Sequence, residues 1–187
     1  MTTREERARA TRRELVEVGL RLSERVGLAG MSINLIVAEA GVAKGTFFHH
    51  FSDRAGFLLA LHREFHDQLF AEILASISDL SPGRARLIRA STTYLDGCLR
   101  HRGVRALLLE ARAEPLIAQE VLDRNDRVSE LIRPDFAAMG WAHPASAGRL
   151  WNGLAVEAAL VELRAGRRQP AVRAALARFL GPDARDS

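Results

Sequence analysis

Apolar residues recur along most of this chain at spacings of three and four, which is the pattern of helices that bury one face. Five such positions define one long helix, expected over residues 52–78: Leu58, Leu61, Phe65, Leu69 and Ile73. Four prolines precede further runs of this kind, as expected for the first turn of a helix: Pro82, Pro115, Pro144 and Pro170. No stretch alternates apolar and polar residues as a strand does. The pattern predicts an all-α fold of about nine helices.

The run over 144–165 differs from the others because it is apolar on almost every side. Only three polar residues interrupt its stretch from 150 to 163: Asn152, Glu157 and Glu162. A helix that is apolar all round is buried all round. One way to achieve this in a small chain is to face the protein's own core on one side and a second copy on the other. We therefore expect a homodimer, with a short helix at 171–180 completing the interface.

Residues 32–51 have the spacing of a helix-turn-helix, and a helix expected from about Arg4 to Val26 precedes them. Ser32 is suited to cap a first helix, whose inward positions are Ile33, Ile36, Val37 and Ala40. Gly41 permits the left-handed backbone of a tight turn, and a second short helix begins near Ala43. Val42 and Phe47 are its expected anchors in the core.

On this geometry the second helix presents Lys44, Thr46 and His49 outward near its N-terminal end. A small, polar, cationic tip of this kind can enter a major groove about 12 Å wide. The pattern therefore predicts that the chain binds double-stranded DNA.

Composition narrows the class of protein without locating the site. The 187 residues include 27 Lys+Arg against 23 Asp+Glu, a net charge of +4, and 48% are hydrophobic, as in ordinary globular domains. Lys44 is the only lysine, so arginines supply every other basic charge. No apolar run is long enough to span a bilayer and the first residues are charged, so we expect a cytoplasmic protein without membrane association. Cys98, the only cysteine, cannot form an internal disulfide.

The stretch AGVAKGTFFHHF at Ala40 to Phe51, with Arg54 after it, resembles the signature of the tetracycline-repressor (TetR) family of bacterial regulators. The resemblance implies an N-terminal three-helix DNA-binding domain over 1–51. It also implies a C-terminal helical domain over 52–187 that binds an effector and dimerises, with the helix at 52–78 as connector. A protein of this kind is a repressor that binds a palindromic operator as a homodimer, is released by a small molecule and uses no cofactor.

The resemblance also implies which residues contact DNA. Ser32 would hydrogen-bond a phosphate from the start of the first helix of the pair. Arg54 would contact another phosphate at the start of the following long helix, whose N-terminus favours an anion. The remaining positions would approach base edges or the DNA backbone: Ala43, Lys44, Gly45, Thr46, Phe48, His49 and His50.

Three residues depart from the family's pattern. Phe48 stands where tyrosine is usual, so the hydroxyl that would donate to a phosphate is absent. Ala43 replaces serine and removes another small donor, and Val37 replaces an alanine at which the two helices approach each other. We therefore expect DNA affinity to depend more on Lys44, the two histidines and Arg54 than is usual in the family.

The sequence is less specific about the effector. Polar or aromatic residues that lie among apolar neighbours are the candidates for lining a pocket: Tyr94, Cys98, Trp151, Asn152 and Glu157. Each also fits an ordinary packing or interface role, which is the commoner one. If they line a cavity, the ligand is a largely apolar or aromatic small molecule, with a cationic or hydroxyl group for Glu157.

Signals for an enzyme or a metal site are weak. His62 and His66 share a helix face, but the glutamate that metalloproteases carry directly after the first histidine is missing. Cys98 and His101 can pair in principle, yet a lone thiol on an apolar face is more often a small core residue. We therefore predict neither enzyme activity nor a metal. The alternative is a small all-α enzyme or binding protein that keeps the helix-turn-helix only as scaffold.

Overall fold

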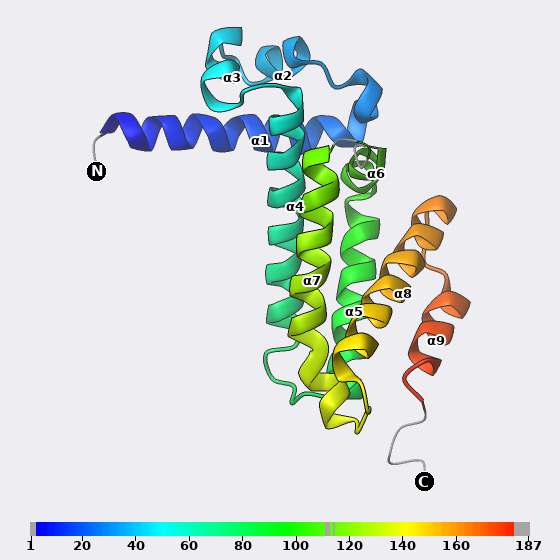
Figure 1. Ribbon diagram of the computed structural model, residues 1–187. Coiled ribbons are helices and arrows are strands. Elements are labelled where there is room, and N and C mark those ends of the chain that lie inside the picture. Colours follow the sequence, from blue (N-terminus) through cyan, green and yellow to red (C-terminus); the bar gives the residue numbers. More distant parts are fainter. Residues whose placement is uncertain (1–2, 111–112, 114, 182–187) are drawn as a thin grey trace. The chain divides into compact units, whose positions relative to one another are not determined.

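The computed structural model describes residues 3–110, 113 and 115–181, and over these residues the chain is built of helices without any strand (Figure 1). The helices of this part are α1 (Thr3–Gly30), α2 (Ile33–Glu39), α3 (Lys44–His50), α4 (Arg54–Ser76), α5 (Arg84–Arg100), α6 (Arg102–Glu110), α7 (Pro115–Ala138), α8 (Pro144–Ala165) and α9 (Pro170–Arg178). The predicted all-α class is confirmed. None of these helices is long and apolar enough to cross a membrane.

Local signals in the sequence explain where several helices begin and end. The backbone N–H of Gly56 donates to the Asp53 carboxylate at 2.8 Å, so Asp53 caps α4. Three helices, α7, α8 and α9, begin at a proline as predicted, whereas Pro82 lies two residues before the start of α5. The regular part of α1 ends near Val26, because Gly27 is non-helical with φ 63°.

The chain divides into two compact units, of which the first comprises Met1–Asp67 and Gly103–Glu120. In this unit α2 packs against both α1 and α3. Its core includes fully buried side chains from α1 to α4: Leu15, Leu22, Ile36, Phe47 and Phe57. Helices α1 and α4 approach closely at Gly19, where a β-carbon would lie 2.6 Å from the Phe57 ring. The helix-turn-helix therefore packs on a buried apolar core that α1 and α4 help to form.

Two polar contacts bind the segment 103–120 to the helices that precede it in this unit. The Glu24 carboxylate on α1 accepts hydrogen bonds from the N–H groups of Gly103 and Val104, at 3.0 and 3.3 Å, in the first turn of α6. On α4, Arg63 donates to the buried carboxylate of Glu120 at 2.8 Å. Nothing in the sequence pattern indicated that α6 and the start of α7 belong with the N-terminal helices.

The second unit comprises Gln68–Arg102 and Val121–Ser187. In it α8 packs against α5 and α9 (Figure 1). The buried face of α8 is formed largely by small residues around one tryptophan: Ala147, Gly148, Trp151, Ala155, Ala158 and Ala159. Small side chains let neighbouring helices approach closely, and the Trp151 indole N–H donates to the Ser91 hydroxyl of α5 at 3.2 Å.

The predicted functional boundary at 51/52 stays a prediction, because compact units are defined by packing and not by what each segment binds. The predicted connector helix is present as α4, within two residues of its expected ends. It contributes residues to both units, up to Asp67 in one and from Gln68 in the other. Helix α7 is divided between the units in the same way, after Glu120.

Candidate nucleic-acid interface

The first helix of the predicted pair begins as the sequence indicates. Ser32 has an extended backbone, and its hydroxyl oxygen accepts a hydrogen bond from the Leu35 N–H at 3.2 Å. A serine hydroxyl that accepts in a cap still carries its own hydrogen to donate. Ser32 is exposed, so that hydrogen can point to a group outside the chain.

The turn places the second helix at the surface of the N-terminal unit. Gly41 has φ 65°, the left-handed conformation that was predicted for the turn, and the Val42 N–H donates to the Val37 carbonyl at 3.0 Å. Helix α3 then starts at Lys44 with Ala43 as its N-cap. Phe47 is fully buried, with its ring 5.2 Å from that of Phe57 on α4, and so fixes α3 on the core.

One face of α3 is open to solvent. Its exposed residues, with the N-cap, are Ala43, Lys44, Gly45, Phe48 and His49, while Thr46 and His50 are half-buried. Neither packing nor backbone conformation within the described residues requires a glycine at position 45. A β-carbon there would meet no described atom within 4 Å, and the φ of Gly45 is not positive. A glycine inside a helix costs about 0.5–1 kcal/mol relative to alanine. The bare position is therefore suited to the close approach of a partner.

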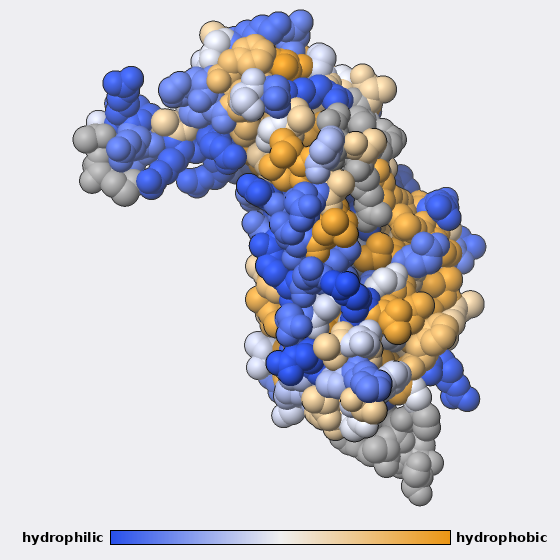
Figure 2. Space-filling view, viewed as in Figure 1, coloured by the Kyte–Doolittle hydropathy of each residue, from blue (hydrophilic) through white to orange (hydrophobic). Residues whose placement is uncertain are grey.

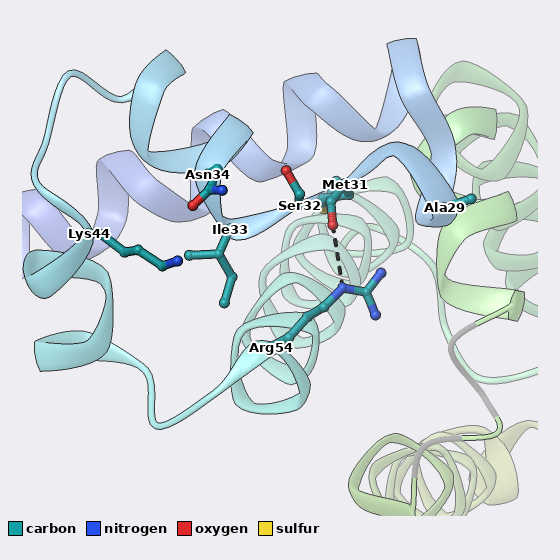
Figure 3. A pocket seen from close by; sticks show the side chains of 7 residues that line it. All are labelled: Ala29, Met31, Ser32, Ile33, Asn34, Lys44 and Arg54. Atoms are coloured by element: carbon teal, nitrogen blue, oxygen red, sulfur yellow. Dashed lines mark hydrogen bonds between the residues drawn. The ribbon is translucent and has the colours of Figure 1, made fainter.

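An open pocket of about 630 Å³ lies beside this face (Figure 3). Its lining residues come from the end of α1, the α1–α2 junction and the starts of α2, α3 and α4: Ala29, Met31, Ser32, Ile33, Asn34, Lys44 and Arg54. The Lys44 side chain extends toward Ile33, and the Nε of Arg54 donates to the Met31 carbonyl oxygen at 3.3 Å (Figure 3). Two cations with a hydroxyl and an amide can bind an anionic oxygen group such as a phosphate.

The end of α3 brings two imidazoles next to an arginine of α1. The His49 and His50 rings lie 5.1 Å apart, and the Arg12 guanidinium lies 5.0 Å from the centre of the adjacent Phe51 ring. Burial, the charge of His49 and the charge of Arg12 together hold the pKa of His50 below its ordinary value of 6.5. The free protein therefore favours neutral His50, and an added anion would favour its protonated form.

The structure thus places the nine predicted DNA-contacting residues on the helix-turn-helix and on the first residue of α4, in two groups. Ser32, Lys44 and Arg54 line the pocket together. The others follow α3: Ala43, Gly45, Thr46, Phe48, His49 and His50. Asn34, which the sequence pattern did not single out, is exposed and lines the same pocket beside Ile33. The sequence signal that could have identified Asn34 is a polar residue among the apolar positions in the first turn of α2.

The candidate effector residues lie in the second unit, and none of them lines the pocket described above. Cys98 and Trp151 are buried, and Tyr94 is half-buried. The side-chain N–H₂ of Asn152 donates to the side-chain amide oxygen Oδ1 of Asn125 at 3.1 Å. Glu157, in contrast, is exposed. Their role in ligand binding stays a prediction.

An ion network that the sequence pattern did not indicate joins α5, α8 and α9 in this unit. The fully buried Glu162 carboxylate accepts from Nε and Nη2 of Arg173, both at 2.7 Å, and from the Gln169 N–H at 2.8 Å. Arg173 also pairs with Asp96 at 2.8 Å. Burial alone raises the pKa of Glu162, but these hydrogen bonds and the arginine charges outweigh it and hold the pKa below 4.5. This network fixes α9 on α8 and α5.

The two histidines considered as metal ligands lie on α4 in the first unit. His62 is buried, and its ring lies 4.4 Å from that of His66. Within the described residues, no group of three or more histidine, cysteine or acidic side chains is placed to hold a metal ion.

Residues 15–61 match the family model described as bacterial regulatory proteins, tetR family. Over 67 residues the chain is 40% identical to the HTH-type transcriptional regulator BetI of Vibrio campbellii, in an alignment that covers 36% of this chain and 34% of that protein. The chain thus spans about a third of the length of this curated relative.

Two solved structures extend the likeness beyond the helix-turn-helix. A transcriptional regulator of Rhodococcus sp. Rha1 superposes with a TM-score of 0.76 at 19% identity, over 91% of this chain and 94% of that one. The multidrug binding protein EbrR, complexed with imidazole, superposes with a TM-score of 0.69 at 23% identity, over 94% and 98% of the two chains. At these identities the likeness shows the fold. Residues 15–61 thus carry the helix-turn-helix motif of the tetR family of bacterial regulatory proteins, and the chain as described shares its fold with these two solved structures.

Proposed function

We propose that this protein is a DNA-binding transcriptional regulator, a repressor that binds a palindromic operator as a homodimer and is released by a small molecule. The observation that carries the proposal is the exposed face of α3 beside a pocket lined by Lys44, Arg54 and Ser32. That arrangement offers side chains to base edges and cations to phosphates at the same surface. A protein that binds the bacterial chromosome works in the cytoplasm, where we place it.

The proposed dimer forms through the outer faces of α8 and α9. Figure 2 shows hydrophobic side chains over these helices on the face drawn. Leu150 is 72% exposed and Phe179 is 61% exposed, and Leu154 follows Leu150 on the same side of α8. Large apolar side chains exposed in this number are suited to a second copy of the chain. A two-fold dimer would place two α3 helices in successive major grooves, about 34–36 Å apart.

The proposed effector is a largely apolar or aromatic small molecule that binds in the second unit. Tyr94, Cys98 and Trp151 would supply its aromatic and apolar contacts, and Asn152 would supply an amide; the first three are buried or half-buried in this unit. The structural neighbour EbrR, a multidrug binding protein seen with imidazole, supports a small aromatic ligand. A ligand that prefers one spacing of the two α3 helices shifts the protein off DNA by its differential affinity for the two states. Because α4 contributes to both units, it is the coupler we propose.

A gel-shift titration with DNA from upstream of the protein's own coding sequence tests the proposal. Specific binding should weaken steeply with salt, because each phosphate contact contributes about 0.9 to the slope of log affinity against log salt. The matched variants are Lys44→Ala on α3 and Arg133→Ala, which removes an exposed arginine of α7. Lys44→Ala should lower the slope by about 2 per dimer, and Arg133→Ala should leave it unchanged. Salt-insensitive or absent binding would favour the alternative in which the helix-turn-helix is only a scaffold.

A further inference from the structure

Phe48 is a large apolar side chain held at the surface of α3. It is 47% exposed, whereas its neighbour Phe47 is fully buried. The two rings meet edge to face, with centroids 5.5 Å apart and planes at 85°. This contact fixes the Phe48 ring without covering it, so a substantial apolar surface stays open to water. Such exposure is unfavourable in the free protein unless a partner covers it.

The surroundings of Phe48 indicate the chemistry of that partner. Lys44 lies one turn earlier on the same face of α3, and Gly45 leaves open space between them. The partner must therefore carry negative charge, approach the helix backbone closely and offer an apolar group to the ring. DNA meets all three conditions, because its phosphates are anionic and its major groove admits a helix.

Only one group on the base edges of the major groove suits a phenyl ring. Phe48 has no hydroxyl, so it cannot donate to a phosphate or to a base acceptor. Of the four bases, thymine alone presents an apolar group there, its C5 methyl, while the others present hydrogen-bond donors and acceptors. We propose that Phe48 contacts the C5 methyl of one thymine in each operator half-site and so makes the protein select thymine at that position. This inference rests on the proposed function of DNA binding.

The test removes single methyl groups from the DNA. A footprint on the upstream fragment defines the bound site, and synthetic duplexes then carry uracil in place of each thymine in turn. Burying one methyl group corresponds to about 4-fold in affinity. At one thymine per half-site, uracil should therefore weaken binding by wild-type protein about 4-fold, and by about 15-fold when both half-sites are changed. With Phe48→Ala, uracil at that position should have no effect.

Two features of the experiment distinguish a thymine contact from a general loss of affinity. Phe48→Ala also removes the edge-to-face contact with Phe47, but that loss lowers affinity for every duplex equally and leaves the comparison between thymine and uracil intact. Phe48→Leu keeps an apolar side chain, so it should retain part of the preference for thymine. Specific binding in which no uracil position distinguishes wild type from Phe48→Ala would overturn the inference alone. Absence of specific binding by the wild type would overturn the proposed function as well.

Discussion

The helix-turn-helix and the C-terminal unit use their polar side chains in opposite ways. Around α3, Lys44 and His49 are exposed, and a β-carbon at Gly45 would meet no atom of the described residues within 4 Å. In the C-terminal unit, the charged groups of Glu162 and Arg173 meet each other inside the fold. Polar groups that are satisfied internally stabilise the unit, whereas those left at an open surface are available to a partner. Whether a polar side chain stabilises the fold or is available for binding therefore depends on its exposure and its hydrogen-bond partners, and not on its residue type.

The largest effect should come from the ion network. Glu162→Gln removes the charge that pairs with Arg173, and breaking a buried ion pair costs about 3–5 kcal/mol in the free energy of unfolding. Because the folded pKa of Glu162 is lowered, its contribution is present above the ordinary pKa of 4.5 and is lost as the pH falls through the folded value. Urea unfolding at several pH values measures both effects.

The matched control is Glu157→Gln on the same helix. Glu157 is exposed, so its replacement should change the free energy of unfolding by less than about 0.5 kcal/mol. Neither variant should alter the salt dependence of DNA binding by the folded protein. Equal stability of the two variants would show that the network does not hold α9 in place.

The second prediction separates two cations that line the same pocket. Lys44→Ala should weaken operator binding and lower its salt dependence without destabilising the protein. Arg54→Ala should do the same and also lower the free energy of unfolding by about 1–2 kcal/mol, because its Nε holds the Met31 carbonyl. Thermal melting and salt titrations of operator binding measure the two properties. An Arg54→Ala protein with wild-type stability would reduce Arg54 to a DNA contact only.

The helix-turn-helix could be predicted nearly to the residue because its signals are local. A cap at Ser32, a positive φ at Gly41 and a buried ring at Phe47 each depend on a few neighbouring residues, and all three are confirmed. The family resemblance added which residues of α3 are expected to contact DNA. Local chemistry of this kind does not depend on how distant helices pack.

The C-terminal unit was less predictable because its polar residues acquire their roles from long-range packing. Glu157 and Glu162 interrupt the same apolar helix, and the residues near them in the sequence do not indicate which of the two side chains is buried. The packing of α8 on α5 and α9 decides it, and Arg173 is 11 residues from Glu162. Glu24 likewise binds the start of α6 across 79 residues. Patterns along the chain therefore located helices but not these contacts.

The third prediction uses the bare surface at Gly45. Gly45→Ala adds a methyl group into open space and should raise the free energy of unfolding by about 0.5–1 kcal/mol, because alanine favours the helix. The same methyl group should weaken operator binding if DNA approaches this position closely. Opposite signs for stability and affinity are the expected result, from thermal melting and gel shifts of one variant. A gain in stability with unchanged affinity would show that the DNA does not come close here.

The smallest predicted effect concerns His50, which is on α3 but is half-buried rather than exposed. Its lowered folded pKa means that the native state favours the neutral ring, so the free protein should lose stability as the pH falls below about 6.5. His50→Gln should reduce this loss in urea unfolding between about pH 7 and pH 5. Operator binding should change in the opposite direction and strengthen on acidification, since a phosphate favours the protonated ring.

The two pH profiles decide where His50 belongs. Arg12 and His49 are the charged and titratable groups that oppose its protonation, and both are present with or without DNA. If stability depends on pH through His50 and operator affinity does not, no phosphate compensates for those charges. His50 would then belong with internal residues such as Glu162, and the DNA-facing surface of α3 would end at His49.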